Sequence, residues 1–347
     1  MGSAAFYTRG NRLIPNLFEV NRLSKFFPVY GGAFLKKIGE VRAVDHISFQ
    51  VKKGEILGLV GESGCGKSTV GRLLLRLIEP TAGTILFEGN DLLALPPADL
   101  LRMRKEIQMV FQDPFSSLNP RVSVGQTIAD PLQALKLADR RGIKKRVREM
   151  MTIVGLDPSL GKKYPHEFSG RDRQRIGIAT ALAVNPKFIF FDEPVSALDV
   201  SAQAQILNLI RYVRDELQIT VLIVAHNLSV VEYVSDRVAV MYLGKIVELA
   251  PTDILYQTPG HPYTQALMSA IQAIDPEEAR KRREIVLRGE IPSPLKAPSG
   301  CKFHTRCQSL LGDVCAEEDP PLQDLGDGHF VACHRDSLSA GRVKNEK

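Results

Sequence analysis

A glycine-rich segment between two apolar runs carries the strongest chemical signal of the chain. Residues 61–68 read GESGCGKS and fit the spacing G-x-x-x-x-G-K-S. Residues 56–60 before it are expected to form a buried strand, and residues 70–78 after it a helix that ends before Pro80. In that setting backbone N–H groups surround nucleotide phosphates, a lysine reaches the β- and γ-phosphates, and a hydroxyl binds Mg²⁺. The pattern predicts these roles for Lys67 and Ser68; a chance glycine-rich turn fits it poorly.

Two carboxylates follow a second apolar run. Residues 188–191 read FIFF and are followed by Asp192 and Glu193. Such a strand presents its last residues at the carboxyl edge of a parallel sheet, where ligands of open α/β sheets bind. We expect Asp192 to bind Mg²⁺ and Glu193 to polarise an attacking water. Gln112 and His226 also follow apolar runs, so contacts with Mg²⁺ and the γ-phosphate are plausible for them, although isolated residues of this kind are usually structural.

Four of the five cysteines lie after residue 300. They are Cys301, Cys307, Cys315 and Cys333, and their spacing is C-x5-C, C-x7-C and C-x17-C. Zinc ribbons prefer much closer pairs, so zinc is not favoured. Four thiolates can hold a [4Fe–4S] cluster, and a metal would help this region to fold because it has few apolar runs. Reduced structural thiols and disulfides in an oxidised protein are the alternatives. Cys65 is interpreted as a tolerated small residue of the glycine-rich loop.

The elements that must position these residues alternate between strand and helix, which indicates an α/β fold with a parallel sheet. The chain has 347 residues, 44% of them hydrophobic and 24% charged, which suits a globular protein of about two domains. No apolar run is long enough to span a membrane, and the first residues lack the apolar core of a signal peptide, so a cytosolic location is expected. Proline becomes frequent near residue 260, where a loop-rich appendage is expected to begin.

The net charge of +6 suits phosphate ligands, nucleic acid or an anionic membrane surface and does not choose among them. Two basic clusters, residues 140–148 and 280–283, contribute to it. Most such runs are solvated faces, with contact to lipid headgroups as the alternative.

The motifs form an ordered set that resembles the ATP-binding subunits of ABC transporters. The set is GESGCGKST, VFQDP, FSGRDRQRIGIATAL, FFDEPVSALD and VAHN. Further segments resemble the subunits that serve di- and oligopeptide importers, namely MVFQDPFSSLNPR, MYLGKIVELAPT, HPYTQALMSAI, GEIPSPLKAPSGCKFHTRC and HFVACH. The resemblance extends over residues 17–336. It implies a P-loop ATPase core (residues 1–259) with a helical subdomain at about 113–180, and a C-terminal extension (residues 260–347) with the four cysteines.

The resemblance also assigns residues to roles. Two subunits would pair head to tail around two ATP molecules, with Mg²⁺ bound by Ser68, Gln112 and Asp192. Catalysis would rest on Glu193, His226, Lys67 and Gln112. Ser169 and Gly170 would serve the partner's ATP, and Asp199 would cross the dimer interface. Phe27 is the expected adenine contact, with Phe26 and Tyr30 as alternatives. The remaining nucleotide contacts would come from Gly61, Glu62, Ser63, Gly64, Cys65, Gly66 and Thr69.

The implied partners are two transmembrane permease subunits, a second ATP-binding subunit and, indirectly, a substrate-binding protein. Residues 112–121 would contact the permease. The chain would then be a peripheral ATPase on the cytoplasmic face of the inner membrane, and no nucleic acid is expected to bind. Some members of the resembled subfamily are thought to carry a [4Fe–4S] cluster in this extension. The transported solute stays open among dipeptides, oligopeptides, nickel and others.

The signature segment departs from the family pattern. Where the family has S-G-G-Q, this chain has Ser169-Gly170-Arg171-Asp172. A side chain at 171 crowds or pairs with a phosphate, and Asp172 places negative charge near it. The alternative is a helix-capping role for the Ser169-to-Asp172 pair. We therefore expect an intact site on this chain and an impaired contribution to the opposite site, as in an asymmetric heterodimer; a homodimer with a tolerant signature is the rival. Thr180 and Asn227 also depart from the family, with no effect that the sequence alone explains.

Two other functions are compatible with parts of this pattern. A soluble ABC-type ATPase acting on nucleic acid or ribosomes would share the nucleotide motifs. It predicts tandem cassettes or long coiled-coil or zinc insertions, and this chain has neither. A regulatory module that holds ATP without turnover is disfavoured by the presence of Glu193 and His226.

Overall fold

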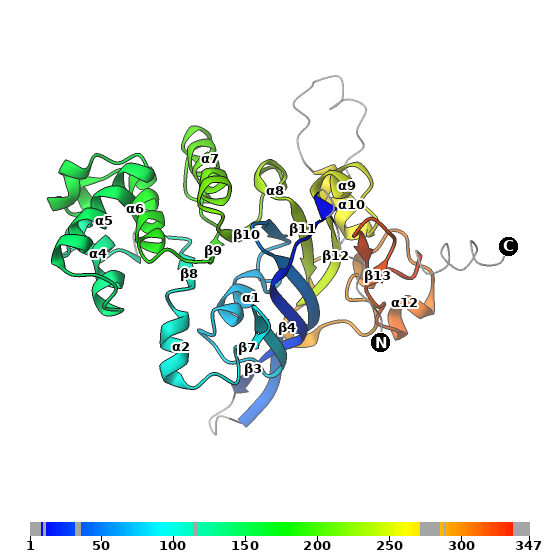
Figure 1. Cartoon of the computed structure of the whole chain (residues 1–347). Coiled ribbons are helices and arrows are strands. Elements are labelled where there is room, and N and C mark those ends of the chain that lie inside the picture. Colours follow the sequence, from blue (N-terminus) through cyan, green and yellow to red (C-terminus); the bar gives the residue numbers. More distant parts are fainter. Residues whose placement is uncertain are drawn as a thin grey trace, which may run out of the picture. The chain divides into compact units, whose positions relative to one another are not determined.

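The computed structural model describes residues 8–9, 12–31, 36–113, 117–270, 285–287 and 289–335. The chain divides into two compact units. The first contains residues 1–52, 57–90 and 226–347, and the second contains residues 53–56 and 91–225 (Figure 1). The α/β class predicted from the sequence is confirmed, with parallel strands and helices in alternation.

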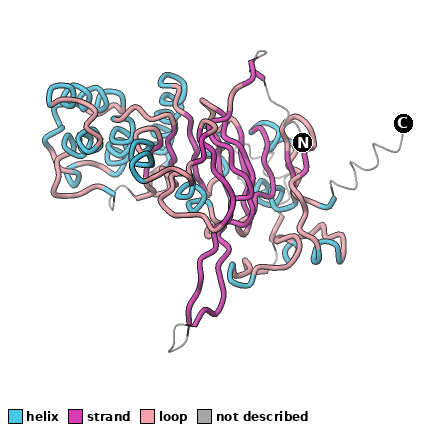
Figure 2. Tube along the Cα trace, turned by 60° about the horizontal axis from the view of Figure 1, so that its bottom comes forward, coloured by secondary structure: helices cyan, strands magenta, loops and turns pink. Residues whose placement is uncertain are grey.

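An antiparallel sheet forms part of the first unit. Its strand order is β4-β3-β6-β7, with bounds Lys36–Lys52, Asn16–Gly31, Ala82–Phe87 and Asn90–Asp91. Figure 2 shows β3 and β4 as two long strands side by side. Phe18 is buried on β3 and meets Phe87 of β6 edge to face, with ring centroids 5.0 Å apart. A short pair, β1 (Thr8–Arg9) and β2 (Arg12–Leu13), precedes this sheet.

A second group of strands in this unit carries the glycine-rich loop. Its order is β13-β14-β12-β11-β5, with bounds Gln323–Asp324, Phe330–Val331, Lys245–Pro251, Arg237–Tyr242 and Ile56–Val60. Strands β5 and β11 run parallel, and β12 and β14 are added antiparallel. All five residues of β5 are buried, as the apolar run predicts. The helix α8 (Leu228–Val234) precedes β11.

The helix after the loop differs from the prediction at both ends. The expected range was 70–78, whereas α1 runs over Lys67–Leu74. Its end is a Schellman motif, in which the N–H of Leu77 donates to the carbonyl of Arg72 and that of Arg76 to Leu73. Arg76 adopts the left-handed φ of 47° that a glycine usually supplies there, so no glycine marks the end of the helix in the sequence. The helix therefore ends well before Pro80.

The C-terminal extension is loop-rich, as predicted. Among the described residues its helical segments are α10 (Pro262–Ser269), η3 (Pro294–Lys296), η4 (His304–Arg306) and α12 (Asp313–Glu317), and α9 (Thr252–Gln257) comes just before it. It is not set apart from the core, because β14 pairs with β12 and the side chains of Tyr263 and Phe303 are buried against Tyr242. The domain boundary at residues 259 and 260 falls between α9 and α10 and stays a prediction.

The second unit contains the parallel strands β10-β9-β8 and a series of helices. The strands β10, β9 and β8 are Thr220–Ala225, Phe188–Asp192 and Ile107–Val110. Thr220 and Ile107 lie opposite Phe188 on either side. The helices are α2 (Pro97–Met103), α4 (Val124–Ala134), α5 (Arg140–Ile153), η1 (Pro158–Lys162), η2 (Pro165–Glu167), α6 (Gly170–Ala183) and α7 (Val200–Leu217).

Helices α4, α5 and α6 form a group (Figure 1), consistent with the predicted helical subdomain. Among the described residues, no helix combines the length and the apolar character needed to cross a membrane.

Candidate nucleotide-binding site

The glycine-rich loop joins β5 to α1 and holds its lysine inside. Lys67 is 5% exposed, and its Nζ donates to the carbonyl oxygens of Gly61 at 2.8 Å and Glu62 at 3.0 Å. Gly66 precedes the helix at φ 111°, and a Cβ there would collide with the backbone carbonyl of Ala43. Only glycine fits such a position. The loop thus presents a buried ammonium and the start of α1 on one side, which fits the binding of a polyphosphate.

The other loop residues lie where the sequence places them. Ser63 and Gly64 are exposed, and a Cβ on Gly64 would meet nothing within 4 Å. Ser68 and Thr69 lie in the first turn of α1. Burial raises the pKa of the Cys65 thiol, and nearby Lys67 opposes this effect. Cys65 is therefore a neutral, buried thiol, as expected of a small packing residue.

The glycine-rich loop, residues 61–68, is called the P-loop from here on. It is also held by two residues that the sequence analysis did not single out. The backbone N–H of Glu62 donates to the hydroxyl of Tyr263 at 2.9 Å, and Arg306 Nη1 lies 2.9 Å from Glu62 Oε2. Tyr263 and Arg306 are separated from Glu62 by 201 and 244 residues. Tyr263 lies in the segment HPYTQALMSAI and Arg306 in GCKFHTRC, and both segments were quoted for the family resemblance. That resemblance was the only feature of the sequence that drew attention to these two segments.

In the second unit, the structure brings together two predicted catalytic residues. Gln112 Nε2 donates to Glu193 Oε2 at 2.8 Å. Glu193 follows β9 in a left-handed conformation with φ 46°, and its N–H donates to the carbonyl of Val224 at 3.1 Å. Non-glycine residues rarely adopt this conformation, and such strain concentrates at functional sites. Asp192, at the end of β9, is only 3% exposed.

His226 lies in the first unit, exposed in the turn between β10 and α8. The next residue has a role that the sequence did not reveal. Asn227 is the N-cap of α8, and its side chain accepts a hydrogen bond from the N–H of Ser229 at 2.9 Å. The hydroxyl of Thr180 donates within α6 to the carbonyl of Ile176 at 2.8 Å. Both departures from the family pattern therefore satisfy local hydrogen bonds.

The signature segment forms the N-terminus of α6. Ser169 is the N-cap: its hydroxyl accepts from the N–H of Asp172 and donates to the Asp172 carboxylate at 2.7 Å. Arg171 lies over the neighbouring helix, where its Nη1 donates to Gln205 Oε1 at 3.2 Å, and its Nε lies 3.3 Å from Asp172. Ser169 thus supplies one half of the expected capping box, whereas the Asp172 carboxylate accepts from the Ser169 hydroxyl. Gly170 is the first residue of the helix.

The expected dimer contact, Asp199, and the expected adenine contact, Phe27, lie on other elements. Asp199 is exposed and caps α7, accepting from the N–H of Ala202 at 2.9 Å. Phe27 is 40% exposed on β3, with Lys25 Nζ 5.0 Å from its ring centre. The alternatives Phe26 and Tyr30 lie on the same strand, with Phe26 near Arg42. An exposed ring suits base stacking, and the choice of Phe27 stays a prediction.

The four C-terminal cysteines are all free thiols. Burial raises the pKa of Cys301 to about 11, opposed by the Phe303 N–H and reinforced by the thiols of Cys333, Cys307 and Cys315. Those three thiols therefore lie near enough to Cys301 to act on it electrostatically. Even so, within the described ranges no group of three or more His, Cys, Asp or Glu side chains is arranged to hold a metal ion. The thiols, as they lie here, do not fit an iron–sulfur cluster.

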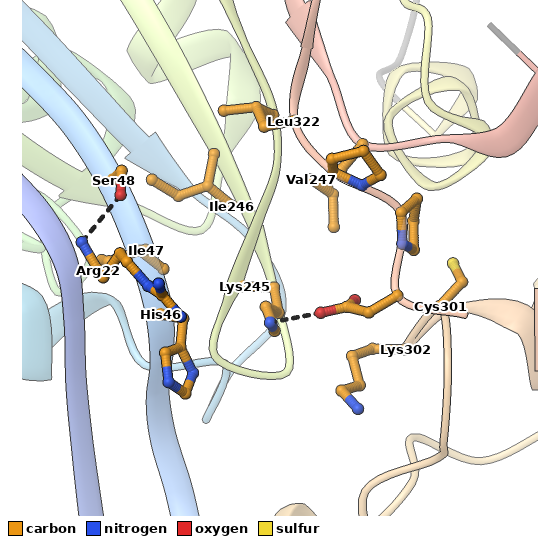
Figure 3. A pocket seen from close by; sticks show the side chains of 14 residues that line it. Arg22, His46, Ile47, Ser48, Lys245, Ile246, Val247, Cys301, Lys302 and Leu322 are labelled. Atoms are coloured by element: carbon orange, nitrogen blue, oxygen red, sulfur yellow. Dashed lines mark hydrogen bonds and ion pairs between the residues drawn. The ribbon is translucent and has the colours of Figure 1, made fainter. Parts of the chain in front are cut away.

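A cavity of about 430 Å³ lies in the first unit, and no P-loop residue is among those that line it (Figure 3). It is lined from β3, β4, β12 and the extension, and Cys301 lies at its edge. Lys245 Nζ donates to Asp319 Oδ2 across it at 2.6 Å. Since none of the predicted nucleotide contacts lines this cavity, it is not the ATP site.

The predicted ATP residues are thus divided between the units. The P-loop, Phe27 and His226 belong to the first, whereas Gln112, Asp192, Glu193, Asp199 and the signature segment belong to the second. Three segments with a sequence-based expectation lie outside the described residues: the first residues of the chain (1–7), residues 114–116 of the expected permease contact, and the basic cluster at 280–283. Residues 336–347 of the expected C-terminal extension also lie outside them.

Comparison with known proteins places this geometry in a family. Residues 44–196 match the model of the ABC transporter family, and residues 247–315 match the "Oligopeptide/dipeptide transporter, C-terminal region" family. The chain is 51% identical over 319 residues to the oligopeptide transport ATP-binding protein AppF of Bacillus subtilis, covering 92% of this chain and 97% of that one. It is 50% identical to a probable peptide ABC transporter ATP-binding protein of Sinorhizobium fredii, covering 92% and 89%.

Solved structures agree with these matches. A dimeric ATP-binding cassette in a post-hydrolysis state, bound to ADP and phosphate, superposes with a TM-score of 0.61 at 25% identity, covering 68% of this chain and 98% of that one. The cbiO1 protein of Clostridium perfringens, part of an ABC transporter complex, gives a TM-score of 0.61 at 27% identity, with coverage of 70% and 91%. The chain therefore belongs to the ATP-hydrolysing, ATP-binding subunits of ABC transporters, in the branch that carries the oligopeptide/dipeptide transporter C-terminal region.

Proposed function

We propose that this ATPase powers the import of di- or oligopeptides through a membrane permease. The observation that supports ATP hydrolysis is the hydrogen bond from Gln112 to Glu193. It orients the carboxylate of a residue that directly follows an apolar strand and has a strained backbone conformation. The peptide class rests on the names of the relatives, which are oligopeptide and peptide transport proteins, and on the matching C-terminal region. No observation favours the nucleic-acid alternative.

Each residue of the nucleotide site has one proposed role in ATP binding or hydrolysis. Lys67 exchanges its two carbonyl partners, Gly61 and Glu62, for β- and γ-phosphate oxygens when ATP binds. Glu193 accepts a hydrogen bond from the attacking water and aligns it with the γ-phosphate, while Gln112 holds the carboxylate in place. His226 would contact the γ-phosphate, and Phe27 would stack on the adenine. These residues orient and stabilise charge, which is most of what phosphoryl transfer requires of a protein.

Magnesium fits the donor set. Ser68, Gln112 and Asp192 offer hydroxyl, amide and carboxylate oxygens, which are the hard ligands that Mg²⁺ prefers. When bound, Mg²⁺ would neutralise charge on the β- and γ-phosphates. The buried position of Asp192 supports a role as a ligand or as the partner of a metal-bound water.

The partners implied by the family are two permease subunits, a substrate-binding protein and a second ATP-binding subunit. The signature supports a second subunit distinct from this chain. Because Asp172 engages the Ser169 hydroxyl and adds negative charge beside it, this chain would contact the partner's γ-phosphate poorly. The hydrolytic site would combine this chain's Lys67 and Glu193 with the partner's signature. Equal ATP turnover at the two sites of the assembled complex would contradict this asymmetry.

For the cysteines we propose reduced structural thiols in place of the expected [4Fe–4S] cluster, because their arrangement does not fit a metal. The absorption spectrum of anaerobically purified protein tests this assignment. Featureless absorption above the protein band supports it, and iron–sulfur charge-transfer bands with matching iron would overturn it.

Affinity purification of the chain from detergent-solubilised membranes tests the proposed function. Recovery with two membrane subunits and a related but distinct ATPase supports a location on the cytoplasmic face of the membrane and an asymmetric importer. Recovery as a free homodimer, or with nucleic acid and no membrane partner, contradicts the transport function and leaves only the ATPase.

A further inference from the structure

The C-terminal extension contacts the P-loop at Glu62. Arg306 Nη1 lies 3.1 Å from Oε1 and 2.9 Å from Oε2 of that carboxylate. The backbone N–H of the same residue donates to the Tyr263 hydroxyl at 2.9 Å. Both the charge and the backbone of Glu62 are therefore held by residues outside the ATPase core. All three residues lie in the same compact unit.

Arg306 and Tyr263 are themselves held firmly. Tyr263, Tyr242 and Phe303 form a buried aromatic cluster with ring centroids 4.7 to 5.4 Å apart. Phe303 directly precedes η4, the turn that ends with Arg306, and the guanidinium also donates to the Tyr242 hydroxyl at 3.4 Å. The Arg306 side chain is 7% exposed and that of Glu62 is 20% exposed. An ion pair held this far from solvent is stronger, and more costly to break, than one on the surface.

A second anchor fixes the start of α10, where Tyr263 lies. The buried carboxylate of Glu248 on β12 accepts from the N–H groups of Gly260 and His261 at 2.8 and 2.9 Å. It also lies 2.7 Å from His329 Nε2 of the extension. These bonds tie the start of α10 and His329 to β12, which belongs to the same sheet as β5.

The location of Glu62 gives these contacts a consequence for nucleotide binding. Its carbonyl accepts a hydrogen bond from Lys67, the residue that must reach the phosphates. A carboxylate in this loop also repels the negatively charged polyphosphate unless a cation neutralises it. Arg306 supplies that cation, and Tyr263 holds the backbone that carries both groups.

We propose that Arg306 and Tyr263 are positioning residues for ATP binding, through which the C-terminal extension neutralises Glu62 and fixes the P-loop. This inference rests on nucleotide binding at the P-loop and not on the identity of the transported solute. It gives the extension a part in the ATPase cycle in addition to any contact with a partner.

The test measures Mg-ATP affinity of the full-length chain with a fluorescent ATP analogue, alongside the melting temperature of each variant. Arg306→Met should raise the dissociation constant about tenfold, which corresponds to about 1.4 kcal/mol. Arg306→Lys keeps the charge and should recover most of the affinity. Tyr263→Phe, which removes only the hydroxyl, should raise the constant about threefold.

Removal of the repelling charge separates this role from a purely structural one. In Glu62→Gln/Arg306→Met the affinity should return to within about threefold of the wild type. The matched control is Lys296→Met, which removes an exposed cation of the same extension for which no ion pair is found among the described residues; its affinity should stay within twofold.

The proposal is overturned if Arg306→Met binds Mg-ATP like the wild type, or if it only lowers the melting temperature. It is also overturned if the double variant binds as weakly as Arg306→Met alone. Failure of the wild-type chain to bind Mg-ATP at all would refute the ATPase assignment itself, so the two failures are distinguishable.

Discussion

Glu193→Gln is the substitution that tests the catalytic geometry most sharply. The carboxylate is held by Gln112 Nε2 at 2.8 Å in a left-handed backbone conformation. Glutamine has the same shape, and its carbonyl oxygen can still accept that hydrogen bond. The substitution therefore keeps the local structure and removes only the negative charge that orients and polarises the water.

The expected magnitude follows from that difference. A positioned acid or base contributes typically 10²- to 10⁴-fold to the rate, so kcat should fall by that factor, about 2.7 to 5.5 kcal/mol. Binding of Mg-ATP should change less than threefold, because Lys67 and the P-loop are intact.

Phosphate release under steady-state and single-turnover conditions, with the ATP dissociation constant measured separately, is the appropriate assay. Glu216→Gln is a matched control, since Glu216 is an exposed carboxylate of α7 in the same unit, and it should leave kcat unchanged. A Glu193→Gln protein that retains more than a tenth of the wild-type kcat would refute the assigned role of this carboxylate.

Three further predictions concern the signature, the aromatic cluster and a buried histidine. Arg171→Gly/Asp172→Gln restores the family signature and should raise ATP turnover of the assembled complex severalfold; unchanged turnover would favour a tolerant signature. Phe303→Ala empties a site that is 1% exposed and should lower the free energy of unfolding by about 3–5 kcal/mol in urea titrations, whereas a loss below about 1 kcal/mol would show that the extension is not part of the core. Burial lowers the pKa of His261 to about 4, partly opposed by Glu248. The unfolded chain then binds the proton more tightly, so stability should fall as the pH drops from about 6.5 towards 4, and His261→Asn should flatten that part of the pH–stability curve. An equal slope in both proteins would contradict the buried, neutral histidine.

Much of the ATPase core could be predicted from the sequence because it depends on local patterns. The β5 strand, the glycines and Lys67 form one continuous segment, and the FIFF run places Asp192 and Glu193 at a strand end. The Ser169–Asp172 cap was predictable for the same reason, since its two partners lie one helical turn apart.

Contacts between distant segments could not be predicted in this way. The Glu62–Arg306 ion pair joins residues 244 positions apart, and neither belongs to a pattern that specifies a partner. The end of α1 was missed because Arg76 takes a conformation usually reserved for glycine. The cysteine spacing was compatible with a cluster, yet spacing does not determine how four thiols on irregular loops are oriented.

The most direct test of the central claim uses a purified complex of this chain with the proposed membrane subunits and substrate-binding protein, reconstituted in lipid vesicles. ATP hydrolysis and uptake of a labelled peptide are measured together, with Glu193→Gln as the inactive reference. We predict peptide accumulation that requires ATP hydrolysis and is lost with Glu193→Gln. ATP hydrolysis without peptide movement for any di- or oligopeptide offered, or peptide uptake that persists with Glu193→Gln, would contradict the account.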